Sequence, residues 1–174
     1  MQVDVFILCY NESKMIRHTL NHYKQFCTNI TIWDNESTDD SVNLARECFP
    51  GVIIKSFTTG KECREDLQTE IRNNCWKGSK ADYVIVCDMD ELLHTEDMVA
   101  ALTLAKQKGD AIPRVSGYNM ISDHFPELYD TLITEQVRSG IRSPSFDKRI
   151  IFAPDKVKEI NFSAGSHFCD PVFW

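Results

Sequence analysis

The sequence has no long run of lysines and arginines, and its 19 basic residues are outnumbered by 26 acidic ones, which gives a formal net charge of −7. Proteins that bind nucleic acids through their charge carry a concentrated basic surface. We therefore expect no nucleic-acid partner. Any contact with a phosphate group must come from a few local side chains.

Export signals and membrane-spanning segments are also missing. The first residues, MQVDVFILCYNE, include no basic stretch, and the apolar run after Asp4 is too short to cross a bilayer. The seven cysteines include no C-x-x-C pair, and most of them fall in apolar segments. These features predict a cytoplasmic protein with reduced thiols and no transmembrane segment.

Signs of several domains are missing too. The chain shows no internal repeat, low-complexity segment or linker, and 174 residues with 43% hydrophobic composition are enough for one substantial core. We expect a single domain over residues 1–174. Because the sequence ends on the apolar residues of DPVFW, we also expect that this domain is excised from a longer protein.

What the sequence does contain is an alternation of two patterns. Short apolar runs alternate with longer segments of helical period, which is typical of an α/β fold with a mostly parallel central sheet flanked by helices. We expect strands at residues 3–9, 29–34, 52–57, 82–87, 111–120 and 148–153. Helices are expected at 13–26, 62–76 and 95–108, and another opens on the capping-box spacing of Ser37 and Asp40. A less regular helical pattern lies within 122–145.

Three predicted strands end in polar residues, namely CYNE at 9–12, WDNESTDD at 33–40 and CDMDE at 87–91. The carboxyl ends of parallel strands meet at one rim of the sheet, where ligands bind. Asp88 and Asp90 share a face of an extended chain, and their oxygens repel each other unless a cation lies nearby. Oxygen ligands favour Mg²⁺ or Mn²⁺ over zinc, and such ions commonly bridge carboxylates and a diphosphate.

The segments FILCYNE, WDNESTDDS and YVIVCDMDE resemble, in this order, three successive signatures of the family 2 glycosyltransferases with the GT-A fold. The resemblance covers residues 3–93. It implies a GT-A (Rossmann-like) domain in which residues 1–93 bind a nucleotide-diphosphate sugar, either a UDP- or a GDP-sugar. Residues 110–174 would complete the metal site and bind a glycan or glycoprotein acceptor. The implied reaction is hexosyl or deoxyhexosyl transfer to a hydroxyl group, with inversion and with Mn²⁺ or Mg²⁺ as cofactor.

The same resemblance implies roles for individual residues. Tyr10 lines the base or stacks on it, and Asp34 forms a hydrogen bond with the base. Asp88 reaches the ribose or the metal, and Asp90 ligates the metal. The other residues assigned to the nucleotide-sugar site are Asn11, Glu12, Met89 and Arg64. Arg64 is preferred over Lys148 and Arg149 as a diphosphate contact, because the loop after the third strand adjoins the donor.

The second half of the sequence departs from the family pattern. Many inverting members carry an acidic ED pair as the catalytic base after the next strand, and no such pair occurs here. The acceptor hydroxyl must still lose its proton as the new bond forms, which requires a base close by. The candidates are Asp123, His124, Glu127 and Asp147. Asp123 is preferred because it lies just past the fifth predicted strand, although a turn or a helix cap before Pro126 is the alternative for it.

The segment AGSHF provides one more candidate. In several GT-A enzymes a histidine near the end of the core returns to complete the metal site, and Gly165-Ser166-His167 resembles that arrangement. Small residues let a loop approach a diphosphate closely. We therefore expect His167 to join Asp90 and Asp88 as a metal ligand.

Three alternatives stay open at the level of the sequence. A phosphatase of the haloacid dehalogenase type also uses D-x-D, but after its first strand, whereas here the motif follows the fourth. A nucleotidyltransferase needs a glycine-rich first loop, and CYNESK contains no glycine. A donor-binding module without activity fits the same first half, and transfer or hydrolysis of the donor sugar distinguishes it from an enzyme.

Overall fold

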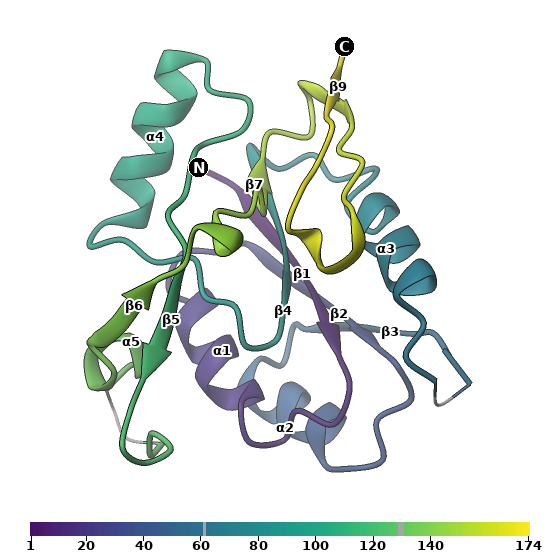
Figure 1. Cartoon of the computed structure of the whole chain (residues 1–174), viewed down its shortest axis with the longest axis vertical. Coiled ribbons are helices and arrows are strands. Elements are labelled where there is room, and N and C mark those ends of the chain that lie inside the picture. The colour runs from purple at the N-terminus through teal and green to yellow at the C-terminus, as the bar shows by residue number, and fades with distance from the viewer. Residues whose placement is uncertain (61, 129–130) are drawn as a thin grey trace.

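The structure is a computed structural model that describes residues 1–60, 62–128 and 131–174. Within these residues, the central sheet has five strands in the order β3-β2-β1-β4-β7 (Figure 1). Their bounds are β1 Val3–Cys9, β2 Asn29–Asp34, β3 Ile53–Ser56, β4 Tyr83–Asp88 and β7 Ile151–Phe152. The first four run parallel, and β7 pairs antiparallel with β4. The predicted α/β class and its mostly parallel sheet are confirmed.

The two central strands, β1 and β4, are apolar except for Asp4 and the terminal Asp88, as expected for strands that are covered on both faces. Side chains alternate between the faces, so Val5 and Ile85 belong to one core cluster, whereas Phe6 and Val84 belong to another. Helices α1 Ile16–Tyr23, α2 Ser41–Cys48 and α4 Met98–Lys108 contribute to the first cluster. Helix α3 Glu65–Asn74 and the C-terminal segment cover the second. The sheet is therefore the middle layer of a three-layer core, and the polar ends of its strands lie at the carboxyl rim of the sheet.

Helix boundaries follow the predicted signals in part. Helix α4 ends at Gly109, which adopts the left-handed conformation (φ 78°), as predicted from its position. The capping box predicted for Ser37 and Asp40 is wrong. Helix α2 begins at Ser41 after Asp40, whose side chain caps nothing, and the Ser37 hydroxyl accepts a hydrogen bond from the Asn11 amide at 2.9 Å instead. A tertiary contact has replaced the local one.

The second half of the fold corrects two predictions. The strand predicted at 111–120 is reduced to β5 Tyr118–Ile121, and it pairs with β6 Ser139–Arg142 outside the central sheet. Pro113 lies within the predicted range and has no amide hydrogen to donate to a strand neighbour. The helix predicted within 122–145 includes residues 129 and 130, which lie outside the described residues. In the part of this range that the structure describes, the helix is a single turn, α5 Ile133–Gln136.

The remaining elements are short. The strand predicted at 148–153 shrinks to β7, and a hairpin of β8 Val157–Glu159 and β9 Val172–Phe173 follows it. The 3₁₀ turn η1 Pro144–Phe146 precedes β7, and η2 Ala164–Ser166 lies between β8 and β9. None of the described helices is both long and apolar enough to span a bilayer. None of the seven cysteines is paired in the structure, and Cys63 is exposed.

Candidate functional site

The loops that follow β1 and β2 are joined by hydrogen bonds at the carboxyl rim of the sheet. Asn11 sits at a positive φ of 57°, and its side-chain oxygen accepts from the Thr38 amide at 2.7 Å. The Glu12 amide donates to the Ser41 hydroxyl at 2.8 Å, and the Ser13 amide donates to Asp39 at 2.9 Å. The predicted convergence of these two polar segments is therefore present, and Asn11 has a structural part in it.

Asp34 and Tyr10 lie next to each other at the ends of β2 and β1. Cys9 is the register partner of Asp34, which places Tyr10 one residue beyond it. The Asp34 carboxylate is buried, and its oxygens lie 3.2 and 3.4 Å from the Ser37 amide nitrogen. The Tyr10 ring is exposed. A carboxylate can accept several hydrogen bonds, so Asp34 can accept from the Ser37 amide and from a ligand at the same time.

Asp88 forms an ion pair with a residue that the sequence analysis missed. The Arg72 side chain in α3 is only 4% exposed, and its Nη2 lies 2.8 Å from Asp88 Oδ1. Its Nη1 lies 3.5 Å from Glu65 Oε2, and neither Nε nor Nη1 has a hydrogen-bond partner among the described residues. Arg64, the predicted cation, is exposed and bound by both oxygens of Asp66 at 2.9 and 2.6 Å. The buried guanidinium at the rim is thus Arg72.

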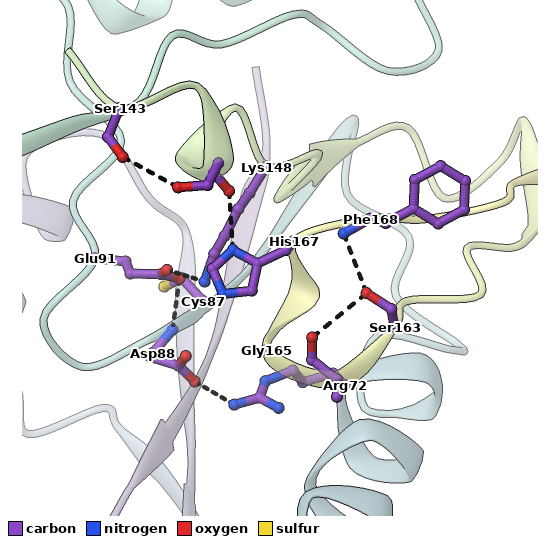
Figure 2. A network of polar contacts seen from close by, with 12 residues as sticks. Arg72, Cys87, Asp88, Glu91, Ser143, Lys148, Ser163, Gly165, His167 and Phe168 are labelled. Atoms are coloured by element: carbon purple, nitrogen blue, oxygen red, sulfur yellow. Dashed lines mark hydrogen bonds and ion pairs between the residues drawn. The ribbon is translucent and has the colours of Figure 1, made fainter.

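The turn after β4 is held by a second ion pair, between Glu91 and Lys148 (Figure 2). The other oxygen of Glu91 accepts from the Asp88 amide at 3.2 Å. Burial raises the pKa of Glu91, the charge of Asp88 raises it further, and the Lys148 ammonium opposes both effects. Met89 contributes little surface to the rim, because its side chain is 1% exposed and its carbonyl accepts from the Thr19 hydroxyl at 2.5 Å.

Negative charge gathers where the three segments meet. Burial raises the pKa of Glu12, and the carboxylates of Asp90, Asp39 and Asp88 raise it further. Asp90 is exposed, and no ion pair engages it in the described parts of the chain. Among the described residues, no three His, Cys, Asp or Glu side chains are arranged to hold a metal ion. A cation at this rim would need oxygen atoms from a ligand to complete its coordination.

His167 is reached through a chain of contacts from Lys148. The Lys148 ammonium lies 5.3 Å from the centre of the Phe146 ring, and this ring meets the His167 ring edge-on at a centroid distance of 5.3 Å. His167 Nδ1 lies 2.8 Å from the Ser145 carbonyl oxygen. Because a carbonyl can only accept, Nδ1 carries a proton, and the tautomer that fits this contact has its lone pair on Nε2. Gly165, at φ 64°, packs against the ring, and a Cβ there would lie 2.9 Å from it.

The residues predicted to act on the acceptor are spread over the second half. Asp123 is exposed just past β5, and the neighbouring Phe125 packs edge-on against His18 of α1 at 5.7 Å. Asp147 is committed to Arg142 at 2.6 Å and to the Gly117 amide at 2.8 Å, and both contacts lower its pKa. Arg149 lines a surface hollow together with His167 and Phe168.

Comparison with known proteins gives a consistent result. The family model described as "Glycosyl transferase family 2" matches residues 4–167. The chain is 32% identical over 91 residues to the SPbeta prophage-derived glycosyltransferase SunS of Bacillus subtilis, which is 52% of this chain and 20% of that protein. It is 37% identical over 56 residues to the uncharacterized glycosyltransferase RP128 of Rickettsia prowazekii, covering 32% of this chain and 19% of that protein. The chain thus spans only a minor part of these relatives.

A solved structure supports the fold. The structure matches that of S. aureus TarS residues 1–349 with a TM-score of 0.55, at 15% identity, over 88% of this chain and 47% of the other. At this identity the similarity concerns the fold alone. Together with the family match, it confirms that the parallel sheet and its flanking helices form a GT-A domain.

Proposed function

Because this chain belongs to glycosyl transferase family 2, we propose that it transfers a hexosyl or deoxyhexosyl group from a nucleotide-diphosphate sugar to an acceptor hydroxyl, with inversion. The observation that carries the proposal is the meeting of the Asp34 turn, the Asp88–Asp90 turn and the buried Arg72 at one rim of the sheet. Asp34 can bind the nucleobase of the donor, Arg72 its diphosphate, and Asp88 and Asp90 a divalent cation.

The nucleotide part of the donor binds at the ends of β1 and β2. Tyr10 offers an exposed ring for stacking, and the buried Asp34 carboxylate accepts a hydrogen bond from a base N–H. Asn11 and Glu12 shape the loop beneath it through their contacts with the loop after β2. These assignments make the donor a UDP- or GDP-sugar, since both bases carry ring N–H donors.

We assign the diphosphate contact to Arg72 ahead of Arg64. Arg72 is fixed by Asp88, and two of its nitrogen atoms, Nε and Nη1, have no hydrogen-bond partner among the described residues, although Nη1 lies 3.5 Å from Glu65 Oε2. Arg64 would first have to leave Asp66. A planar guanidinium with free donors matches the paired oxygens of a phosphate.

The cation, Mn²⁺ or Mg²⁺, would be held by Asp90 and Asp88, by the Nε2 atom of His167 and by oxygens of the donor. Without the donor, no three such side chains among the described residues are arranged to hold an ion. The donor set suits a hard cation, and Mn²⁺ accepts an imidazole nitrogen beside oxygens more readily than Ca²⁺ does. Burial raises the pKa of Glu12, and the nearby carboxylates of Asp90, Asp39 and Asp88 raise it further; this crowding of carboxylates supports a compensating positive charge at the rim. When bound, such an ion neutralises charge that develops on the departing nucleoside diphosphate.

The acceptor is a glycan or glycoprotein hydroxyl, and Asp123 removes its proton. Asp123 is an exposed carboxylate in a segment that packs against α1 through Phe125. Its exposure leaves it able to meet an acceptor from solution. The seven free thiols support a location in the reducing cytoplasm.

A donor-turnover assay tests the proposal. Wild-type protein is incubated with radiolabelled UDP- and GDP-sugars and Mn²⁺, and release or transfer of the sugar is measured in parallel with an Asp90→Asn variant. Turnover that depends on Asp90 is expected. Binding of nucleotide without turnover would favour the inactive donor-binding module, and no binding of either nucleotide would overturn the proposal.

A further inference from the structure

A buried ion pair joins the two halves of the fold. Lys148, just before β7, is 6% exposed in its side chain, and Glu91, just after β4, is 17% exposed. Buried ion pairs add little net stability, because removing both charges from water costs about as much as their attraction returns. Their clearest effect is to fix the geometry of the groups that they connect.

Glu91 connects this pair directly to the turn after β4 (Figure 2). One carboxylate oxygen meets Lys148, while the other accepts from the Asp88 amide at 3.2 Å. The Glu91 carbonyl accepts from the Tyr23 hydroxyl at 2.9 Å, so the turn is also tied to α1. The position of the Asp88–Asp90 backbone therefore depends on a carboxylate whose charge is balanced by Lys148.

Lys148 also reaches the segment that carries His167. Its ammonium lies over the Phe146 ring at 5.3 Å, and that ring packs against the His167 ring. Three residues before Lys148, the Ser145 carbonyl fixes His167 Nδ1 at 2.8 Å. Figure 2 shows Lys148 with Glu91, Asp88 and His167 around it. Lys148 thus contacts both Glu91, which supports the Asp88–Asp90 turn, and Phe146, which packs against His167.

We propose that Lys148 is a positioning residue that fixes the Asp88–Asp90 turn relative to the segment carrying His167, at the rim where the cation and the diphosphate of the donor would bind. The inference rests on the proposed function. It assigns no contact between Lys148 and the donor, because the ammonium is already engaged by Glu91 and Phe146. Loss of Lys148 should therefore reduce the increase in nucleotide affinity that Mn²⁺ gives, and leave the nucleotide affinity without metal unchanged.

Isothermal titration calorimetry tests the inference. The dissociation constants of UDP and GDP are measured with and without Mn²⁺ for the wild type, Lys148→Met and Lys148→Arg. We expect Lys148→Met to reduce the Mn²⁺ enhancement by about 10- to 100-fold, as is common when a residue behind the metal ligands is lost. The metal-free dissociation constant should stay unchanged. Lys148→Arg should recover most of the enhancement, because it keeps the charge opposite Glu91.

Three further variants separate positioning from general destabilisation. The double variant Glu91→Gln/Lys148→Met leaves no uncompensated charge, and its amide oxygen can still accept from Asp88, so it should fold and still lack the enhancement. Lys77→Met, which removes the Lys77–Glu159 ion pair at 2.7 Å, should keep the enhancement. Leu102→Ala, which leaves a cavity beneath α4, should lower the melting temperature and keep it too.

The outcomes distinguish a failure of the positioning role of Lys148 from a failure of the proposed function. A normal enhancement in both Lys148→Met and the double variant, or an equal loss in Leu102→Ala, overturns the positioning role alone. Wild-type protein that binds the nucleotide equally with and without Mn²⁺ overturns the cation site and this inference, whereas wild-type protein that binds neither nucleotide overturns the proposed function as well.

Discussion

At the scale of single residues, several candidate ligands of the donor also hold the protein together. The Asp34 carboxylate accepts from the Ser37 amide, and the Asn11 side chain accepts from the Thr38 amide. Replacing either residue by alanine removes a structural hydrogen bond as well as any contact with a ligand. Informative substitutions must therefore preserve the acceptor that the loop uses.

Asp34→Asn meets this requirement. The amide oxygen of asparagine can still accept from the Ser37 amide, while its NH₂ group opposes an N–H donor of the base. We expect the affinity for UDP or GDP to fall by about 1–3 kcal/mol, with the free energy of unfolding little changed. Calorimetry and urea denaturation measure the two quantities. If Asp34→Asn binds the nucleotide as tightly as the wild type, Asp34 only stabilises the turn at Ser37 and does not contact the base.

Asp123→Asn tests the catalytic base. The substitution keeps the size of the side chain but removes its ability to take a proton, so turnover should fall by about 10²–10⁴-fold while donor affinity is unchanged. Asp147→Asn is the matched control, because Asp147 is already bound by Arg142 and Gly117. Transfer rates that fall more in the control than in Asp123→Asn would move the base assignment away from Asp123.

At the scale of elements, the parallel strands were the most predictable part of the fold. Residues 3–9 and 29–34 were predicted with the bounds that β1 and β2 have, because strands buried on both faces are recognisable as continuous apolar runs. The strand predicted at 111–120 was wrong because β5 is exposed and pairs only with β6, so burial does not determine its composition. The local sequence pattern therefore predicts a strand well only where burial requires its residues to be apolar.

The candidate site shows the same division. Asp34, Asp88 and Asp90 were predicted at the rim because they lie at or just beyond the carboxyl ends of buried strands, and in the structure they lie at the ends of β2 and β4. Arg72 was missed because its partner Asp88 lies 16 residues away, and Glu91 and Lys148 are 57 residues apart. Such pairs follow from how α3 and β7 pack on the sheet, which no local period encodes.

The junction between the loops after β1 and β2 is expected to respond to acid. Although burial raises it, hydrogen bonds from Ser41 and Ser13 lower the pKa of Asp39 to about 2, against an ordinary value of 3.8. A carboxylate with a lowered pKa stabilises the folded state above its unfolded pKa, and this contribution is lost as the pH falls through the folded pKa. Stability from Asp39 should therefore decline between about pH 4 and about pH 2.

Asp39→Asn isolates this contribution. Asp39 is exposed, so the pH-dependent difference in unfolding free energy between wild type and variant should be at most about 1 kcal/mol. Urea denaturation from pH 5 to pH 2 measures it. Parallel pH profiles for the two proteins would show that the hydrogen bonds of Asp39 do not select its charged form.

At the scale of the whole molecule, the proposed ligand faces an unfavourable field. The chain carries a net charge of −7, and Glu12, Asp39, Asp88 and Asp90 lie together at the rim. The two buried cations at the rim, Arg72 and Lys148, already balance Asp88 and Glu91. A nucleoside diphosphate adds further negative charge, so its binding should depend strongly on an added divalent cation.

Thermal unfolding measures this dependence across the whole fold. A ligand that binds only the folded state at about 100 times its dissociation constant adds about 2.7 kcal/mol of stability. For a chain of this length, that raises the melting temperature by about 5–10 °C. We expect such a rise with UDP or GDP plus Mn²⁺, a much smaller one with nucleotide and EDTA, and a small one with Mn²⁺ alone, because the described side chains form no complete metal cage. Adenosine diphosphate controls for general diphosphate binding. An equal rise with nucleotide in EDTA would show that Arg72 and its neighbours neutralise the diphosphate without a metal ion.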